Sequence, residues 1–281
     1  MRVLPFKIPK PELDALVYQE DIESFFYDKL HQHEEIQISY IIKGEGTLIV
    51  GDTINYYKSG DVLVIGSNLP HVFNSDIAAI STSHMLSLFF TQFSFGKDFF
   101  RLEELKSLLL FFKRAKHGFK VTSSKKAITH LFLELKISSK FERFVILLNL
   151  LKIISSASYK SLSSFIYEKK YTEIEGKRMR NVFDYTMVHF NETITLEIIA
   201  DVSNMTKNAF CKYFKKRTNK TYLQFLNELR VEYACKLLLS ENDLPIAEIA
   251  YKSGFKNISN FNRQFNTLKK QSPSSYKTSN R

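Results

Sequence analysis

The chain contains few of the residues that mark secreted or membrane-spanning proteins. Its 2 cysteines, Cys211 and Cys235, do not stand in a paired spacing of the kind that stabilises small secreted domains. The first residues, MRVLPFKIPKPELDAL, include no unbroken apolar stretch like that of a signal peptide, and no run of about 18 residues is free of charged or polar interruption. These absences favour a reducing, cytoplasmic location and predict no membrane partner.

The common signatures of catalysis are also missing. The sequence has no glycine-rich phosphate loop, no nucleophile elbow, and no cysteine and histidine cluster with the spacing of a structural zinc site. It therefore predicts no enzyme, no catalytic residue and no cofactor.

The positive charge of the chain is concentrated at its C-terminal end. The 281 residues carry a formal net charge of +11. From Lys177 to Arg281, 18 lysines and arginines face 9 acidic residues, whereas the first 176 residues hold 22 against 20. The chain is long enough for two hydrophobic cores, which predicts two domains. Because the second part is basic, it is the one expected to bind a polyanion.

The N-terminal part changes from a strand pattern to a helix pattern. Residues 36–93 contain short apolar runs (IQISYII, TLIV, TINYY, VLVI) separated by glycine-containing turns, which is typical of a sandwich or barrel. After Gly96, apolar residues recur at intervals of three and four and predict helices as far as Ser155. The small, polar run SSASYKSLSS over 155–164 predicts a hinge.

The C-terminal part contains an internal repeat. Its two copies are LEIIADVSNMTKNAFCKYFKK and IAEIAYKSGFKNISNFNRQFN. In each copy a short helix reaches a residue that readily takes a positive φ, Asn204 or Gly254, and a second helix follows at once. Thr206 and Asn257 stand where the caps of these second helices belong. The repeat predicts two helix-turn-helix units.

Each second helix has an apolar and a polar face. Phe210 and Phe214 in the first copy, and Phe261 and Phe265 in the second, are expected to point inward and leave polar and basic side chains for the major groove. A merely solvated face is the alternative, which the duplication argues against. Between the copies, one long helix is expected to hold the two reading helices about 34 Å apart; its predicted buried stripe is Tyr222, Leu226, Leu229, Tyr233 and Leu237.

From about Met179 to Lys277 the sequence resembles the DNA-binding domain of the AraC/XylS family of transcription regulators. The resemblance rests on AFCKYFKKRTNKTYLQFLNELRVEYACKLL and IAEIAYKSGFKNISNFNRQFNTLKKQSPSSY. Asn204 replaces the usual turn glycine, and Asn219 and Lys270 stand where the family has glycine after each recognition helix. The resemblance implies binding to a double-stranded promoter site, and activation rather than repression.

The resemblance also implies roles for individual residues. By position, base reading falls on Asn208, Cys211, Lys212, Ser259, Asn260, Asn262 and Arg263, with Lys212 and Arg263 foremost. Phosphate contacts are expected from Lys207, Lys215 and Lys216. For Arg230, a structural ion pair with Glu197, Glu228 or Glu232 is preferred to a role in DNA binding.

The N-terminal part resembles the cupin barrel in the variant fused to such regulators, on the basis of His31-Gln32-His33, Gln37, Gly44, Gly60 and Pro70-His71. Gln37 stands where metal-binding cupins carry a glutamate, so no metal is expected; a site of His31, His33 and His71 is the alternative. The resemblance favours a pocket for a small-molecule effector, of which a sugar is one candidate. The expected lining is His31, His33, Gln37, Tyr40, His71 and Phe73, with Phe89 and Phe93 as further aromatic walls.

We therefore expect an α+β chain of two domains. A cupin-like β-barrel effector domain covers 1–98, a helical dimerisation or packing region 99–155, a linker 156–178, and an all-α AraC-type domain, with two helix-turn-helix units joined by a long helix, 179–278. The expected function is effector-controlled, sequence-specific transcription regulation by a homodimer that contacts RNA polymerase. The alternatives are a metal-dependent cupin enzyme and a non-specific DNA-binding protein.

Overall fold

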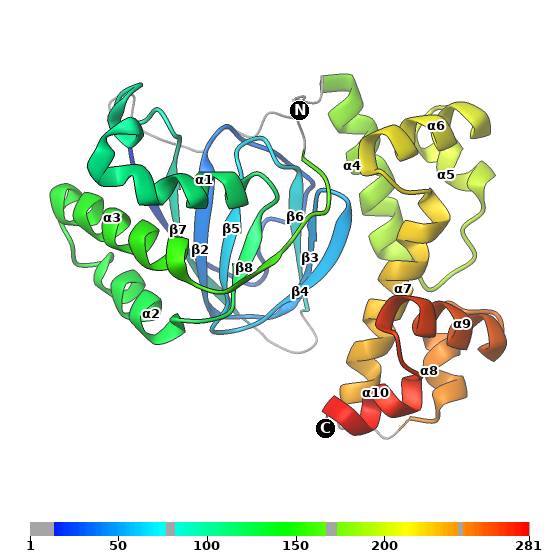
Figure 1. Ribbon diagram of the computed structural model, residues 1–281. Coiled ribbons are helices and arrows are strands. Elements are labelled where there is room, and N and C mark those ends of the chain that lie inside the picture. The colour runs from blue at the N-terminus through cyan, green and yellow to red at the C-terminus, as the bar shows by residue number, and fades with distance from the viewer. Residues whose placement is uncertain (1–13, 77–81, 167–172, 241–243, 281) are drawn as a thin grey trace. The chain divides into compact units, whose positions relative to one another are not determined.

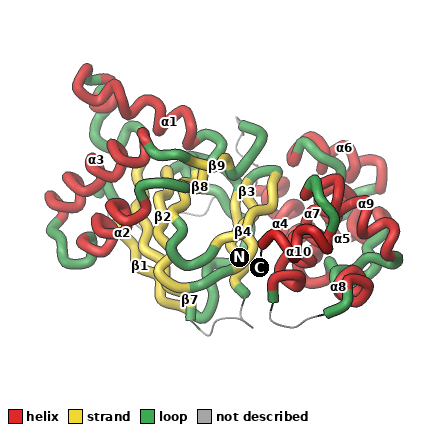
Figure 2. The backbone as a smooth tube through the Cα atoms, turned by 60° about the horizontal axis from the view of Figure 1, so that its bottom comes forward, coloured by secondary structure: helices red, strands yellow, loops and turns green. Residues whose placement is uncertain are grey.

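The computed structural model describes residues 14–76, 82–166, 173–240 and 244–280. The chain divides into two compact units, residues 1–176 and 177–281. The first unit combines β-sheets with helices, and the second consists of helices and loops within its described residues (Figures 1 and 2). The predicted α+β class with two domains is confirmed.

The first unit contains two antiparallel sheets. The larger has six strands in the order β1-β7-β2-β5-β8-β9, and the smaller has three in the order β4-β3-β6. The strands are β1 (Val17–Glu23), β2 (Ile36–Lys43), β3 (Gly46–Val50), β4 (Thr53–Tyr57), β5 (Val62–Ile65), β6 (His71–Ser75), β7 (Ser83–Phe90), β8 (Phe119–Val121) and β9 (Tyr159–Ser161). The four runs recognised in the sequence became β2 to β5. Strand β1 was missed because its residues, VYQEDIE, are polar on both faces.

Two hydrophobic cores lie on the two faces of the larger sheet. One lies inside the barrel and includes Leu48, Tyr57 and Met85. The other lies between the sheet and the helices that follow the barrel, and includes Ile38 and Leu147. These helices cover the outer face of the sheet in Figure 1; they are the 3₁₀ helices η1 (Phe99–Arg101) and η2 (Glu103–Leu108) and the α-helices α1 (Leu109–Ala115), α2 (Lys125–Glu134) and α3 (Lys140–Ser156).

The segment expected to be a hinge, 155–164, is attached to the barrel instead. Its residues 159–161 form β9, which pairs with β8. Asp52, in the turn between β3 and β4, then accepts hydrogen bonds from Ser163 Oγ (2.8 Å), from the Ser164 backbone N–H (2.9 Å) and from Ser164 Oγ. The small polar residues of this segment serve as hydrogen-bond donors to the barrel, so their composition was misread as that of a free linker.

The second unit is arranged around the long helix α7. Its elements are α4 (Glu173–His189), α5 (Leu196–Val202), α6 (Lys207–Thr218), α7 (Tyr222–Leu239), α8 (Ile246–Lys252), α9 (Ile258–Lys269) and α10 (Pro273–Asn280). Helices α5 and α6 form one helix-turn-helix unit, and α8 and α9 form the other. Among the described helices, none combines the length and apolarity needed to span a bilayer.

The buried face of α7 differs from the predicted stripe in its C-terminal half. Tyr222, Leu226 and Leu229 are buried as expected, but Tyr233 and Leu237 are only partly buried. The reason is that α7 serves two small cores with different faces. Its C-terminal half instead buries Val231, Ala234, Cys235 and Leu238 in the core of the second helix-turn-helix unit.

The attachment of residues 159–164 can be tested with Asp52→Ala. Asp52 is buried and accepts three hydrogen bonds. Its loss removes the acceptor of the Ser164 backbone N–H and hydroxyl, whereas the Ser163 hydroxyl keeps the Phe165 carbonyl oxygen at 2.9 Å. We expect the free energy of unfolding of the barrel to fall by about 1–3 kcal/mol. Trypsin should also cleave severalfold faster after Lys160, as measured by mass spectrometry of timed digests. The control is Asp98→Ala, which removes an exposed acid of the same unit; equal cleavage in both variants would contradict the attachment.

Candidate nucleic-acid interface and barrel pocket

Each helix-turn-helix unit turns at a residue with left-handed backbone. Asn204 has a φ of 52° and Gly254 a φ of 84°. The recognition helices α6 and α9 then begin after Thr206 and Asn257, whose side chains each accept a hydrogen bond from the backbone N–H three residues further on. The predicted turns and caps are confirmed.

The recognition helices expose the predicted reading residues. Phe210, Phe214, Phe261 and Phe265 are fully buried, as predicted. The opposite faces carry the side chains to which base reading was assigned: Asn208, Lys212, Ser259, Asn262 and Arg263 are exposed, whereas Cys211 and Asn260 are partly buried. Arg263 Nη2 donates to Asn260 Oδ1 at 3.0 Å, so the two side chains are held together on one turn of α9.

The three lysines expected at phosphates differ in their surroundings. All of Lys207, Lys215 and Lys216 are exposed. Lys207 Nζ, however, donates to Glu197 Oε1 at 2.8 Å. This hydrogen bond lowers the pKa of Glu197 and raises the pKa of Lys207. Because an ammonium group has three N–H donors, Lys207 can keep this partner while it contacts a phosphate.

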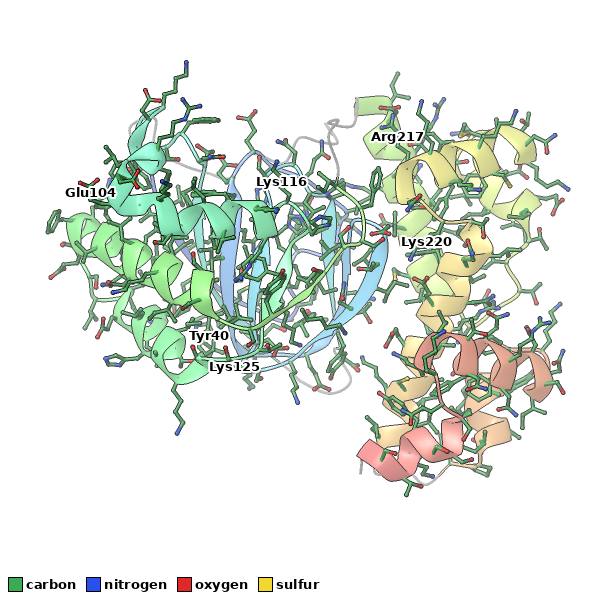
Figure 3. All side chains as sticks on the ribbon, viewed as in Figure 1. Tyr40, Glu104, Lys116, Lys125, Arg217 and Lys220 are labelled. Atoms are coloured by element: carbon green, nitrogen blue, oxygen red, sulfur yellow. The ribbon has the colours of Figure 1, made fainter. Side chains whose placement is uncertain are left out.

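Two further lysines join the recognition helices to α7. Lys220, labelled in Figure 3, follows α6 and donates to both carboxylate oxygens of Glu228 at 2.7 and 2.9 Å. Lys269, the last residue of α9, donates to Glu232 Oε1 at 2.6 Å. Glu228 and Glu232 are one helical turn apart on α7, so this one helix holds the C-terminal ends of both recognition helices. These pairs join different elements of the fold, so the sequence carried no local signal for them.

Arg230 has the structural role preferred for it, but the three glutamates named as partners were wrong. Its Nε donates to the carbonyl oxygen of Phe190 and its Nη2 to that of Glu192, both at 2.7 Å. Gly254 lies against the same loop, because a Cβ at this position would be 2.7 Å from the Phe190 oxygen and 2.9 Å from Arg230 Nε. The turn of the second unit is therefore packed against the loop that precedes the first.

Gly254→Ala tests this close packing. The new Cβ would meet backbone atoms at a residue whose φ is 84°, so we expect the free energy of unfolding to fall by about 1–3 kcal/mol. The matched change in the other unit is Asn204→Gly, where relief of left-handed strain offsets the added freedom of the unfolded chain; the effect should stay within about 1 kcal/mol. Urea unfolding of the full chain, followed by circular dichroism, measures both. Equal destabilisation would show that the turn at Gly254 is not specially constrained.

Three histidines converge inside the barrel. His31 and His71 are joined by two backbone hydrogen bonds of 3.0 and 2.9 Å, and His33 lies next to them. All three are buried, and one ring nitrogen from each lies within 4.8 Å of the others. In a tetrahedral site each nitrogen lies about 2.1 Å from the Zn²⁺, so the three rings would have to move closer together to hold one ion.

Hydrogen bonds to the backbone fix which nitrogen of each ring faces the centre. The Nδ1 atoms of the three histidines lie 2.8–2.9 Å from the carbonyl oxygens of Lys29, Glu35 and Leu69. A carbonyl only accepts, so in His31 and His71 Nδ1 carries the hydrogen and Nε2 keeps its lone pair, which is the arrangement of histidines that bind metals. His33 lies between two acceptors, the Glu35 carbonyl oxygen at Nδ1 and the Gln37 amide oxygen at Nε2. His71 Nε2 is buried, and no described residue forms a hydrogen bond with it.

The groups around the cluster are the neutral amide of Gln37 and the carboxylate of Glu35, which lies 3.8 Å from His33 Nδ1. Burial lowers the pKa of His33, and burial together with the two other histidines lowers that of His71, so both stay unprotonated ligands. Gln37 donates to Ser39 Oγ at 2.8 Å and places Oε1 3.4 Å from His33 Nε2. Three imidazoles with an amide oxygen fit a borderline cation such as Zn²⁺ or Co²⁺, although less tightly than a set with a carboxylate. The geometry thus favours the three-histidine alternative that Gln37 had argued against.

Metal addition tests the cluster directly. We expect Zn²⁺ to raise the melting temperature of the chelator-treated protein, because a ligand that binds only the folded state stabilises it. His71→Ala should abolish the rise, and Gln37→Glu should tighten zinc binding by about tenfold or more by supplying an anionic ligand. The exposed His130 provides the control variant, His130→Ala. No thermal shift in the unmodified protein, or the same shift in His71→Ala, would show that these histidines do not hold a metal.

A pocket of about 390 Å³ opens beside the histidine cluster. The predicted residues His31, Gln37, Phe73 and Phe89 line it, together with Gln19, Asp21, Glu23, Ser24, Phe25, Phe26, Tyr27 and Met85. His33 and His71 are outside this lining, in the cluster behind it. The size suits a small organic ligand.

Two expected aromatic walls lie elsewhere. Tyr40, labelled in Figure 3, packs against Phe132 of α2 with ring centroids 5.8 Å apart. The reason is strand alternation: Gln37 and Ser39 face the barrel interior, so Tyr40 faces the helices. Phe93 is 62% exposed and lies beyond the end of β7.

Both units match known protein families. Residues 199–279 match a helix-turn-helix domain, and residues 24–79 match a cupin domain. An uncharacterized HTH-type transcriptional regulator of Bacillus subtilis (strain 168), YdeC, is 26% identical over 279 residues, which cover 96% of this chain and 93% of the relative. An uncharacterized HTH-type transcriptional regulator of Staphylococcus aureus is 28% identical over 111 residues, 40% of this chain and 15% of the relative.

Solved structures are similar as well. The DNA-binding domain of AdpA, crystallised in complex with a target DNA, is 26% identical with a TM-score of 0.33, over 35% of this chain and 87% of that one. ToxT from Vibrio cholerae O395 is 14% identical with a TM-score of 0.37, over 94% of this chain and 97% of that one.

A duplicated helix-turn-helix unit, joined in one chain to a cupin domain, defines a transcriptional regulator. The predicted resemblance to AraC-type regulators with an N-terminal cupin domain is confirmed.

Proposed function

We propose that this regulator reads a specific promoter site with α6 and α9 and that a small molecule in the barrel pocket controls its binding. The observation that carries the proposal is the pair of exposed polar faces attached to one helix, α7. Lys220 and Lys269 attach the ends of the two recognition helices to α7, and Arg230 attaches α7 to the loop before the first unit. These contacts support presentation of both faces together to successive major grooves.

The chemistry of each face supports base reading. Lysine and arginine pair with guanine, and asparagine pairs with adenine through two hydrogen bonds. We assign base contacts to Asn208, Cys211 and Lys212 in the first unit and to Ser259, Asn260, Asn262 and Arg263 in the second. Lys207, Lys215 and Lys216 are proposed phosphate contacts, and Lys207 can make its contact without losing the hydrogen bond to Glu197.

Exposed apolar residues support a homodimer. Ile137, in the loop between α2 and α3, is 88% exposed, and Phe141, at the start of α3, is 75% exposed. Leu133 of α2 and Val145 of α3 are exposed as well. A solvent-exposed group of large apolar side chains is typical of an interface. Activation and contact with RNA polymerase are inferred from the family resemblance, and binding to a promoter agrees with the expected cytoplasmic location.

Selection of random duplex DNA on the full chain tests the proposal. We expect one enriched motif with two short elements about one helical turn apart. Lys212→Ala should relax one element and Arg263→Ala the other, each reducing discrimination by about 1–3 kcal/mol. Lys252→Ala, an exposed lysine of α8 paired with Glu248, is the control. The absence of any motif, with candidate effectors present, would leave only non-specific binding.

A further inference from the structure

The charged residues around the barrel pocket are acidic. Its lining includes the carboxylates of Asp21 and Glu23 and contains no lysine or arginine. Gln19, Asp21 and Glu23 alternate along β1, so the strand points all three to the same side, toward the pocket. Two negative charges at one opening disfavour an anionic ligand.

Neither carboxylate is neutralised within the described part of the chain. Asp21 accepts a hydrogen bond from Gln19 Nε2 at 2.6 Å, and no ion pair to Asp21 or Glu23 is formed by the described residues. Glu20, on the other face of β1, contrasts with them because it pairs with His84 and Lys136 at 3.0 and 3.2 Å. Burial and the charge of Glu23 raise the pKa of Asp21, because both disfavour its ionised form. A bound cation would stabilise that ionised form.

The rest of the pocket is aromatic. Phe25 and Tyr27 are exposed at its rim, and Phe26, Phe73 and Phe89 are buried at its base. Ring faces attract organic cations, and this attraction adds to that of a nearby carboxylate. The buried polar groups at the base, His31 and Gln37, can each form a hydrogen bond to a ligand atom.

We propose that the pocket takes an organic cation, an amine with a flat apolar body, whose ammonium group lies at Asp21 and Glu23 and whose body packs among the phenylalanines. The inference rests on the proposed function, in that this pocket is the effector site. A neutral sugar, the candidate named from the family resemblance, would leave both carboxylates uncompensated. An acid would be repelled by them.

Three indole compounds of nearly equal shape and different charge test the proposal: tryptamine, tryptophol and indole-3-propionate. The chain contains no tryptophan, so the anisotropy of indole fluorescence reports the probe alone. We expect tryptamine to bind the full chain at least about tenfold more tightly than tryptophol, a difference of about 1.4 kcal/mol. Indole-3-propionate should be the weakest of the three.

Variants then assign the preference to the two carboxylates. Asp21→Asn and Glu23→Gln should each weaken tryptamine binding severalfold and leave tryptophol binding unchanged. Asp98→Asn, which changes an exposed acid of the same unit outside the pocket, should alter neither. The proposal is overturned if tryptamine does not bind at about 1 mM, if indole-3-propionate binds as tightly, or if the preference survives both substitutions.

The same preparations separate this inference from the proposed function. If DNA selection yields the two-element motif while tryptamine fails to bind, the inference about the ligand is wrong and the DNA-reading proposal stands. If tryptamine binds as expected and no motif is enriched, the pocket chemistry stands and the DNA-reading proposal fails.

Discussion

The hydrogen bonds from Arg230 to the carbonyl oxygens of Phe190 and Glu192 are the contact on which the DNA-binding unit most depends. A planar guanidinium presents several donors in fixed directions and can hold two carbonyls at once, which a lysine cannot do with the same geometry. Arg230 belongs to α7. A Cβ placed on Gly254 would lie 2.9 Å from Arg230 Nε, so the glycine packs directly against this side chain. One side chain therefore ties the loop before the first helix-turn-helix unit to the turn of the second.

The parts of this arrangement that local chemistry determines could be predicted from the sequence. A positive φ favours asparagine or glycine, so Asn204 and Gly254 indicated the turns. The phenylalanines at intervals of four residues indicated which face of each recognition helix is buried. The partners of Arg230 could not be predicted in this way, because main-chain carbonyls have no sequence signature and lie 38 and 40 residues away.

The barrel shows the same division between local and long-range information. Tyr40 could have been placed outside the pocket, because it stands an odd number of residues after Gln37 on one strand. Asp21 and Glu23 were missed, since a strand with acids on both faces does not alternate in polarity. The convergence of His31 with His71 depends on a backbone pairing between distant segments, and the attachment of Ser163 and Ser164 depends on Asp52, 111 and 112 residues away.

Under the proposed control by an effector, a packed element that links the ligand-binding region to the segment that leaves the barrel would carry the coupling. The hairpin of β3 and β4 is such an element. Val50, at the end of β3, pairs with His71, and the Gly51 N–H donates to the Pro70 carbonyl oxygen at 2.8 Å. The next residue, Asp52, binds Ser163 and the residue after it. Within three consecutive residues the hairpin passes from the histidine cluster to residues 163–164, so a shift of β6 around a bound ligand would act directly on the chain that leads to the DNA-binding unit.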